Sequence, residues 1–275
     1  MKQKNNSEHP VCPICGAVSQ KPLGKGLFLC EECRCAFNTA HEIPAYNEDY
    51  FTGDYLKQYG RTYEDDFEHI YKAGATRLSR IKDIGGQLGS LLDIGCALGF
   101  FLKAALDAGY TPVRGIEISA YAAGYCKQKF GFDVAATSFE KTDFDNNYAA
   151  ITCWYFLEHT ADPKSAVEKI SAALSQGGVF AFSAPSVFGP MFRRHRAEWL
   201  ASRPVDHRVD FSPAAAKRLL AAAGFRKVRV YAGGIHPERV LHRTSRFYKP
   251  FAFVYRLFAQ LTAYSDTIEV YGVKG

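Results

Sequence analysis

Between residues 90 and 274, short apolar runs alternate with segments whose apolar side chains recur every three or four positions. The apolar runs predict strands at 91–95, 113–119, 132–137, 148–156, 177–185, 226–232 and 267–274. The periodic segments predict helices at 100–110, 122–130, 163–174 and 212–225, the last capped by Ser212 and ended by Gly224. Strands separated by helices pair in parallel, so the pattern predicts an α/β fold with a doubly wound, seven-stranded sheet.

The segment before the first of these strands is rich in aromatic residues. Tyr46, Tyr50, Tyr55, Tyr59 and Tyr63 recur every four or five residues, with Phe51 next to Tyr50, and helical spacing fits from Thr62 to Ile84. Gly85 and Gly86 end this helix. Two interpretations remain open: a connector that packs on the core, or a lid over a bound ligand.

Five of the eight cysteines lie between Cys12 and Cys35. Cys12 and Cys15 form one C-x2-C pair, and Cys30 and Cys33 form a second after a gap of 14 residues. Two such pairs offer four thiolates to a tetrahedral Zn²⁺, which predicts a small zinc ribbon with a turn at 23–26. Cys35 is a fifth thiol that can replace Cys33, although the paired spacing favours Cys33.

The ribbon, the aromatic segment and the sheet suggest three parts. We expect a zinc ribbon at 1–45, a Tyr-rich helical connector or lid at 46–86, and the α/β domain at 87–275 with an insert at about 233–264. The ribbon holds five basic and four acidic residues, a balance that makes nucleic acid an unlikely partner. Its simplest role is structural.

Length and composition narrow the class of protein. With 275 residues, 47% of them hydrophobic, the chain can bury one large core. No run approaches the ~18 to 20 apolar residues of a membrane span. The first ten residues lack the apolar stretch of a signal peptide. We therefore expect a cytoplasmic protein.

Positive charge is concentrated near the C-terminus. Residues 181–275 hold 16 Lys and Arg against 6 Asp and Glu, a net +10, although the whole chain carries only +6. The alternatives are a solvated basic surface or a site for an anionic substrate. The candidate substrate-binding residues follow the fifth predicted strand of the sheet: Arg193, Arg194, Arg196, Arg203 and Arg208.

The sequence LLDIGCALGFF at 91–101 carries a strand, an acid and a small-residue turn. Gly95, Ala97 and Gly99 allow a ligand to approach the backbone, and Glu117 lies 22 residues after Gly95, where an acid can bind ribose hydroxyls. The row G-x-A-x-G, preceded by Asp93, departs from the dinucleotide pattern G-x-G-x-x-G. The motif favours an adenosine cofactor with a cationic tail.

Four motifs in order carry a family resemblance: LLDIGCALGFF, GIEIS, ITCWYFLEHTADP and HRVDFSPAAAKRLLAAAGF. Residues 91–232 resemble class I S-adenosylmethionine-dependent methyltransferases, which have a Rossmann-like sheet. The whole chain resembles bacterial members with an N-terminal zinc ribbon, many of which act on sugars, glycans or secondary metabolites. The resemblance implies these cofactor contacts: Asp93, Gly95, Ala97 and Gly99 at the methionine and ribose, Glu117 at the ribose hydroxyls, Ile118, Ser138 and Phe139 around the adenine, and Trp154 beside the sulfonium.

Methylation of an amine or hydroxyl also requires loss of a proton, so a nearby base is useful. His159 is the first candidate, because it follows the fourth strand at the cofactor end of the sheet, and His207 is the second. Either histidine can instead be structural.

The leading interpretation is a methyltransferase for a small, anionic acceptor such as a nucleotide-linked or phosphorylated sugar. The alternatives are an RNA methyltransferase guided by the ribbon and an inactive binding or scaffold protein of the same fold. The aromatic insert at 236–264 can pack on the sheet, form a homodimer or cover an apolar substrate.

Overall fold

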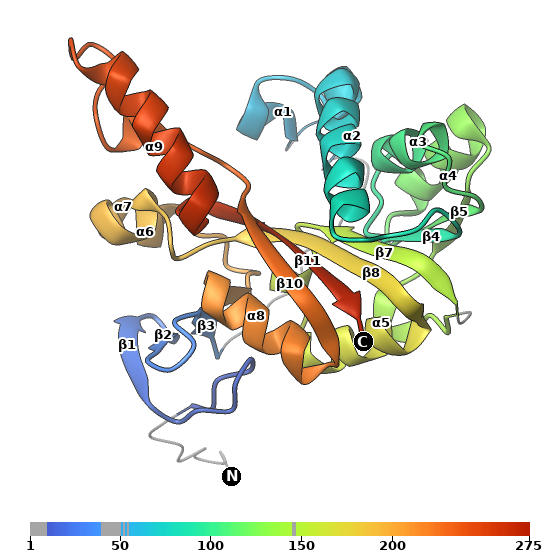
Figure 1. The fold of residues 1–275 in the computed structure, drawn as a ribbon, viewed down its shortest axis with the longest axis horizontal. Helices are drawn as coiled ribbons and strands as arrows, with labels where there is room; N and C mark the ends of the chain where they lie inside the picture. The colour runs from blue at the N-terminus through green and yellow to red at the C-terminus, as the bar shows by residue number, and fades with distance from the viewer. Residues whose placement is uncertain (1–9, 40–50, 52, 54, 145–146) are drawn as a thin grey trace.

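The computed structural model describes residues 10–39, 51, 53, 55–144 and 147–275. Its main sheet has seven strands in the order β10-β11-β8-β7-β4-β5-β6 (Figure 1). The bounds are β4 (Leu91–Ile94), β5 (Val113–Glu117), β6 (Asp133–Ala136), β7 (Tyr148–Trp154), β8 (Leu174–Pro185), β10 (Phe225–Ala232) and β11 (Thr267–Lys274). The Rossmann-like α/β fold expected from the sequence is confirmed.

One strand departs from the all-parallel expectation. β11 pairs antiparallel with both β8 and β10, whereas β4, β5, β6, β7 and β8 pair in parallel. The segment between β10 and β11 does not cross the face of the sheet but projects away from it (Figure 1). Without a crossover, the returning strand can run only in the opposite direction.

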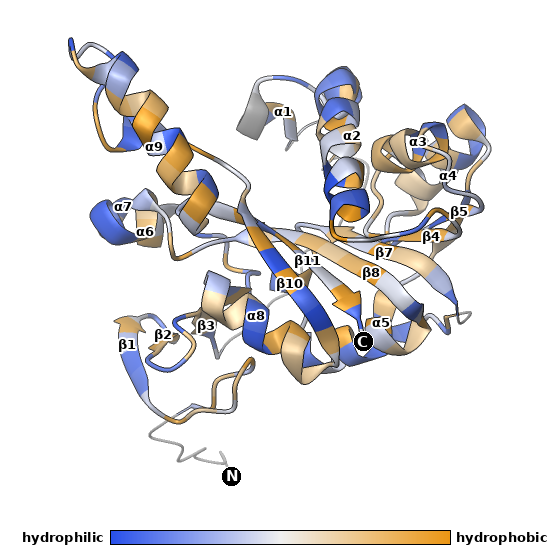
Figure 2. Ribbon diagram, viewed as in Figure 1, coloured by the Kyte–Doolittle hydropathy of each residue, from blue (hydrophilic) through white to orange (hydrophobic). Residues whose placement is uncertain are grey.

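Helices cover both faces of the sheet (Figure 1). One face carries α2 (Phe67–Asp83), α3 (Phe100–Asp107) and α4 (Ala120–Phe130), and the other carries α5 (Pro163–Ala173) and α8 (Pro213–Ala222). The apolar stripes of these helices bury the inner faces of the central strands, which hold fully buried residues such as Leu91, Ile151 and Phe180. At the open edge, hydrophilic and hydrophobic positions are mixed along β10 (Figure 2), and its charged residues suit an edge strand exposed to water.

The N-terminal part forms a small antiparallel sheet in the order β1-β2-β3-β9. Its bounds are β1 (Gln20–Gly24), β2 (Leu27–Cys30), β3 (Ala36–Asn38) and β9 (Val209–Asp210). The predicted hairpin turn is present, with Lys25 and Gly26 at positive φ. A hairpin turn implies two strands, and two further strands are found because β3 and β9 are too short to leave an alternating pattern. Since β9 lies far along the chain, the ribbon is paired directly with the α/β part.

The aromatic segment packs on α3 and α4. The predicted helix at 62–84 is divided into a 3-10 helix, η2 (Glu64–Asp66), and α2, and a short helix α1 (Tyr55–Tyr59) precedes them. The rings of Tyr63 and Phe67 contact the ring of Phe100, with centroids 5.6 Å and 5.0 Å away. The ring of Phe51 contacts that of Tyr63, with centroids 5.5 Å apart. Tyr46 and Tyr50 lie outside the described residues. The packing of the rest supports the connector interpretation, and the lid stays a prediction.

The remaining elements cluster near the carboxyl ends of the parallel strands. They are η3 (Phe139–Lys141), η4 (Leu157–His159), α6 (Pro190–Arg194), α7 (Arg196–Ser202), η5 (Pro237–Arg239) and α9 (Tyr248–Thr262). α9 extends far from the body of the molecule (Figure 1). Within the described ranges, none of the helices has the length and apolar character needed to cross a bilayer.

Candidate active site and metal centre

The loop after β4 turns sharply in front of the sheet. Gly95, Ala97 and Gly99 have φ values of +70°, +49° and +78°, in the left-handed region that favours glycine. A Cβ on Gly99 would lie 2.8 Å from the Sγ of Cys126, so glycine there lets α3 approach α4. A Cβ on Gly95 would lie 3.4 Å from the ring of Phe156. This contact places the segment after β7 beside the glycine loop.

Glu117 ties the end of β5 to the glycine loop. Its carboxylate accepts a 2.9 Å hydrogen bond from the N–H of Ala97 and a 3.0 Å bond from the N–H of Ser119, which caps α4. The side chain is buried, and burial raises its pKa. The next residue, Ile118, is 53% exposed and is free to contact a ligand. An acid held at this edge suits the hydroxyl groups of a ribose.

Asp93 lies under the glycine loop and is fully buried. The hydroxyl of Thr152 donates to it over 2.6 Å. Burial raises the pKa of Asp93 to about 7, although the Thr152 bond and the charge of Arg77 oppose the rise. A carboxyl group poised in this way gains from a cation nearby, and S-adenosylmethionine carries a sulfonium and an ammonium group.

Trp154, at the end of β7, lies edge-on to Phe101 with 5.1 Å between ring centroids. The guanidinium of Arg77 lies 4.1 Å above its ring, and the indole Nε1 is buried without a partner. Arg77 also pairs with Glu269 over 3.0 Å, and Arg80 pairs with the same carboxylate. No local pattern in the sequence predicts this pair of arginines and their acid, because 192 positions separate Arg77 from Glu269.

The residues expected at the adenine edge have different settings. Phe139 is buried, with its ring 5.5 Å from those of Phe144 and Phe156. Ser138 is half-buried and begins the 3-10 helix η3. Phe139 thus belongs to the core under the loop, while Ser138 and Ile118 remain accessible. The described residues around the glycine loop fit an adenosine cofactor with a cationic tail.

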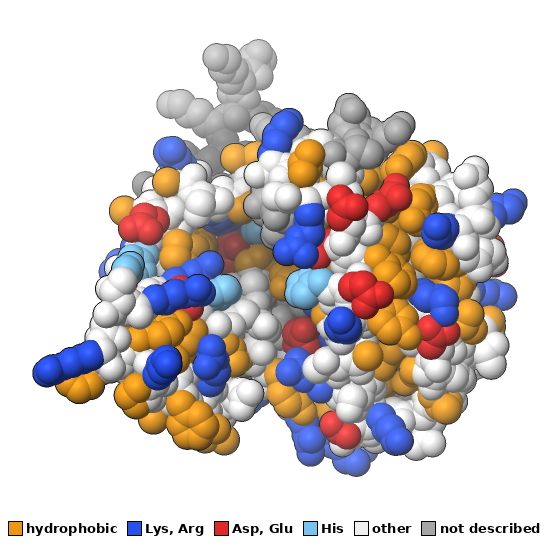
Figure 3. Space-filling model, turned by 90° about the horizontal axis from the view of Figure 1, so that it is seen from above, with side chains coloured by type: hydrophobic (Ala, Val, Ile, Leu, Met, Phe, Trp, Pro, Cys, Tyr) orange, Lys and Arg blue, Asp and Glu red, His pale blue; other side chains and the backbone are white. Residues whose placement is uncertain are grey.

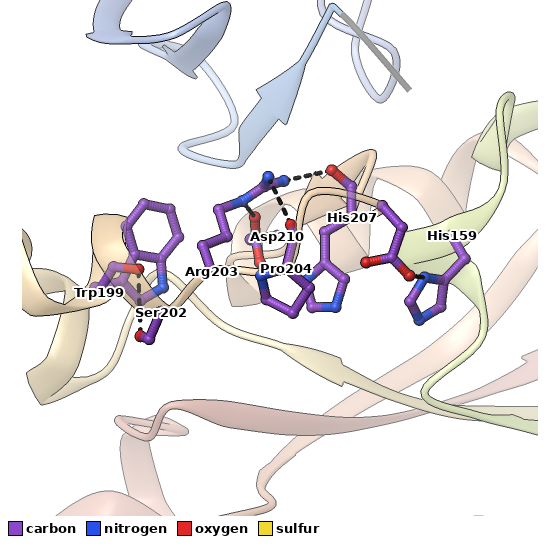
Figure 4. Close-up of polar contacts among 8 residues, drawn as sticks. His159, Trp199, Ser202, Arg203, Pro204, His207 and Asp210 are labelled. Carbon is purple, nitrogen blue, oxygen red and sulfur yellow. Dashed lines mark hydrogen bonds and ion pairs between the residues drawn. The ribbon is translucent and has the colours of Figure 1, made fainter. Parts of the chain in front are cut away.

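Two histidines lie side by side at the carboxyl end of the sheet (Figure 4). The ring centroids of His159 and His207 are 5.0 Å apart. The Nδ1 of His159 lies 2.8 Å from Asp206, and the Nδ1 of His207 lies 3.2 Å from Asp210. In a neutral histidine, each carboxylate favours the tautomer that carries its proton on Nδ1, in which Nε2 is the basic nitrogen. Sequence reasoning had named the histidines but not their acids.

Electrostatic interactions favour the protonated form of His159 and the ionised form of Asp206. Burial opposes protonation of His159, but the hydrogen bond to Asp206 and the charges of Glu158 and Asp206 raise its pKa above the ordinary value. Burial likewise opposes ionisation of Asp206, yet its bond to His159 lowers the pKa of Asp206 to about 2. The pair is therefore well suited to taking up a proton.

The five candidate arginines do not share one setting. Arg193 and Arg194 are exposed on α6, and Arg196 is exposed on α7 with its guanidinium 4.0 Å from the ring of Phe192. The side chain of Arg203 is only 7% exposed: it pairs with Asp210 and donates to the backbone carbonyls of Pro204 and His207 (Figure 4). Arg208 has a buried Nη1 without a partner. Arg203 thus holds the loop that contains His207, whereas Arg208 has one hydrogen-bond donor, Nη1, without a partner.

Four cysteines of the ribbon form a cluster consistent with a zinc site. One ligand atom from each of Cys12, Cys15, Cys30 and Cys33 lies within 4.8 Å of the others. The Sγ atoms of Cys12 and Cys33 are 3.7 Å apart, and those of Cys15 and Cys30 are 3.6 Å apart. Zn–S bonds of about 2.3 Å in a tetrahedron place sulfurs roughly 3.8 Å apart, so the spacing fits the ion.

The fifth thiol lies beside this cluster. The Sγ of Cys35 is 3.6 Å from that of Cys12 and 3.4 Å from that of Cys33.

A second group of possible metal ligands is formed by Glu158, His159 and His207, whose ligand atoms also lie within 4.8 Å of one another. Glu158 is buried and its Oε2 has no partner. These groups can hold a cation or share protons.

The face of the molecule above the sheet is hollowed (Figure 3). The hollow separates the lobe of α6, α7 and α9 from the lobe of α2, α3 and α4, and histidine and acidic side chains line it. The carboxyl ends of the strands meet here, as expected for the ligand site of a doubly wound fold.

Comparison with known proteins supports a methyltransferase site at this end of the sheet. Residues 66–230 match the family model described as a methyltransferase domain. Ubiquinone biosynthesis O-methyltransferase of Bordetella avium is 27% identical over 129 residues, which cover 44% of this chain and 53% of that protein. The chain spans about half the length of the curated relatives it matches.

Solved structures share the fold. A S-adenosylmethionine-dependent methyltransferase from Archaeoglobus fulgidus aligns with a TM-score of 0.54 and 16% identity, covering 77% of this chain and 98% of that one. A Haemonchus contortus phosphoethanolamine N-methyltransferase aligns with a TM-score of 0.55 and 17% identity, covering 80% and 59%. The family match extends over more than half of the chain. This protein belongs to the class I S-adenosylmethionine-dependent methyltransferases.

Proposed function

We propose that this enzyme methylates an oxygen atom of a small anionic molecule, with one of the two histidine–carboxylate pairs as the base. The observation that carries the proposal is the arrangement of His159 and His207, whose rings are 5.0 Å apart and each of which has a carboxylate at its Nδ1. Several proteins that match in sequence are named ubiquinone biosynthesis O-methyltransferases, which supports oxygen as the accepting atom.

The residues around the glycine loop would hold the cofactor. Glu117 would bind the ribose hydroxyls, Gly95 and Ala97 would face the methionine part, and Ile118 with Ser138 would border the adenine. The buried carboxyl of Asp93 would stabilise the cationic tail. When bound, S-adenosylmethionine supplies an electrophilic methyl group on its sulfonium.

The chain's own residues would then handle one proton. The acceptor hydroxyl would donate to the Nε2 of a histidine, and its oxygen would form a bond to the methyl carbon as the carbon–sulfur bond breaks. The bonding pair would leave with S-adenosylhomocysteine, and the proton would remain on the imidazole. Asp206 or Asp210 would stabilise the imidazolium.

Arginine would select the charge of the acceptor. Arg208 has a buried guanidinium nitrogen without a partner, on the same loop as His207. A phosphate or carboxylate would satisfy it with a charge-assisted hydrogen bond. Arg193 and Arg194 on α6 and Arg196 on α7 are exposed and would add an attractive field.

We also propose that Zn²⁺ occupies the sulfur cluster of Cys12, Cys15, Cys30 and Cys33, where it would be structural. Four thiolate ligands would fill the tetrahedral coordination of the zinc ion and leave no coordination position for a substrate. The backbone N–H of Cys33 donates to the Sγ of Cys30 over 3.5 Å, which supports a thiolate at that position.

The test is a screen of hydroxylated acceptors in matched phosphorylated, carboxylated and neutral forms, followed by release of S-adenosylhomocysteine. We expect an anionic acceptor to be best, and Arg208→Gln to raise KM more than it lowers kcat. Lys72→Gln removes an equal charge from an exposed side chain on α2 and is the control. A neutral or RNA acceptor, or an unchanged KM in Arg208→Gln, would contradict the proposal.

A further inference from the structure

Helix α9 and the residue before it expose an unusual amount of apolar surface. The exposed fractions are 58% for Phe247, 64% for Phe253, 63% for Val254, 47% for Leu257, 48% for Phe258 and 87% for Leu261. Exposed large apolar residues elsewhere in the described chain are scattered, as is usual for a protein surface. A contiguous group of this kind marks a contact surface.

The exposed residues form one stripe along the helix. Phe247, Val254, Phe258 and Leu261 recur every three, four or seven positions, and Phe253 and Leu257 extend the stripe on one side. The opposite side holds Ala252, Tyr255 and Ala259, which are buried against Ala232 and its neighbours. The body of the protein therefore accounts for the inner side of α9. None of the described residues buries the outer stripe.

Positive charge borders this stripe. Residues 236–264 contain Arg239, Arg243, Arg246, Lys249 and Arg256, with Glu238 as the only acid. Arg239 pairs with Asp266, and Arg243 pairs with Glu238 over 3.7 Å although its side chain is 71% exposed. The guanidinium of Arg246 lies 4.6 Å from the ring of Phe247. In Figure 3 the lobe that contains α9 shows lysine and arginine side chains beside clustered apolar ones.

The charge decides between possible occupants. In a symmetric dimer this surface would contact its own copy, which would bring two groups with an excess of cations together. A nucleic acid would match the cations but would leave six apolar side chains against a phosphate backbone. An anionic bilayer surface satisfies both features, because its headgroups pair with the cations and its acyl boundary accepts the apolar stripe.

We infer that α9 docks this methyltransferase onto the surface of membranes that contain anionic lipids. The helix has 15 residues, fewer than the ~20 that a span requires, and it would lie in the plane of the interface with the outer stripe buried. The far end of α9 projects beyond the rest of the molecule, so the body does not obstruct this approach (Figure 1).

The experiment is flotation of the full chain with phosphatidylcholine vesicles, with and without phosphatidylglycerol. We expect binding only when phosphatidylglycerol is present, weakened by salt. Leu257→Glu with Leu261→Glu should reduce binding by at least about tenfold, and Arg243→Gln with Arg246→Gln and Lys249→Gln should weaken it similarly. Leu106→Glu, an exposed apolar residue on α3, is the control and should bind like the wild type.

Circular dichroism and binding of S-adenosylmethionine establish that each variant is folded. Absence of binding to phosphatidylglycerol vesicles would overturn the inference, as would full binding by the Leu257→Glu, Leu261→Glu variant. Light scattering gives the third outcome. A dimer that these two substitutions dissociate, with no vesicle binding by the wild type, would assign the stripe to a second copy of the chain.

Discussion

The hydroxyl of Ser212 donates a 2.6 Å hydrogen bond to the backbone carbonyl of Cys33 and accepts one from the N–H of Ala215 at the start of α8. One side chain therefore joins the cysteine cluster to a helix of the main domain. Next to it, Ala36 of β3 pairs with Asp210 of β9, the acid that holds His207. The cysteine cluster thus supports the loop of the candidate base.

Loss of the proposed zinc ion from the ribbon should loosen this loop. We expect Cys33→Ser to release zinc and to raise hydrogen exchange at 207–212, because β9 loses its partner strand. Binding of S-adenosylmethionine should persist, since the glycine loop lies on other strands. Metal content, exchange mass spectrometry and calorimetry measure these three effects. Cys35→Ser is the matched control and should keep its metal; if it loses metal while Cys33→Ser does not, Cys35 is the fourth ligand.

Glu117→Gln should weaken cofactor binding by about 1 to 3 kcal/mol, because a charged acceptor for the ribose hydroxyls is lost. Calorimetry with S-adenosylmethionine measures the change. Glu140→Gln alters an exposed acid on η3 and should bind normally. Equal affinity in the two variants would remove Glu117 from the proposed site.

Asp93 should make cofactor binding depend on pH. Its raised pKa of about 7 keeps the carboxyl largely protonated below neutrality in the free protein. A bound cation favours the ionised form, so binding should release a proton and strengthen as pH rises toward 7. Calorimetry in buffers of different ionisation enthalpy detects the proton. Asp93→Asn should abolish the release, and an unchanged release in that variant would show that another group titrates.

Asp93 should also affect the stability of the fold. As pH rises, its effect on the free energy of unfolding has the opposite direction to its effect on cofactor affinity. An acid whose pKa is raised in the folded state binds its proton more tightly there than in the unfolded chain. Its contribution to the free energy of unfolding therefore falls as pH rises from about 4 to 7. The difference between wild type and Asp93→Asn in denaturant melts across this range isolates the effect from that of other titrating groups.

The pH dependence of turnover should identify the base. The raised pKa of His159 places its deprotonation above the ordinary value of 6.5, so kcat/KM should rise with pH through that region if His159 is the base. Asp206→Asn should lower kcat and move the midpoint to lower pH, because the imidazolium loses its partner. A profile unchanged in Asp206→Asn but shifted in Asp210→Asn would assign the base to His207.

Glu269→Gln should destabilise the fold by about 3 kcal/mol, because Arg77 and Arg80 would share a mostly buried site without an acid. Thermal or urea unfolding measures the loss. Glu198→Gln changes a 72% exposed carboxylate and should leave stability within about 0.5 kcal/mol of the wild type. A similar small effect for Glu269→Gln would mean that water already screens the arginines.

The sequence predicted what local periodicity and spacing determine. The strands of the main sheet, the α8 cap at Ser212 and the paired cysteines all leave short-range signals, and the structure has each of them. The antiparallel direction of β11, the pairing of β9 with the ribbon and the carboxylates behind His159 and His207 depend on contacts between distant segments. No periodicity within one segment records such contacts. The division of the arginines into a buried Arg203 and a donor-rich Arg208 likewise emerges only from packing.

The chain contains two tryptophans, and the fold separates them. Trp154 lies beneath Arg77 at the end of the main sheet, whereas Trp199 packs edge-on to Phe192 in a cluster with Leu27 and Leu29 of the ribbon. Each indole is thus an intrinsic optical reporter of a different part of the molecule. With one of them replaced by phenylalanine, the fluorescence of the other follows either the cofactor end or the ribbon contact. Comparing the two unfolding curves would reveal whether ribbon and sheet form one cooperative unit or two.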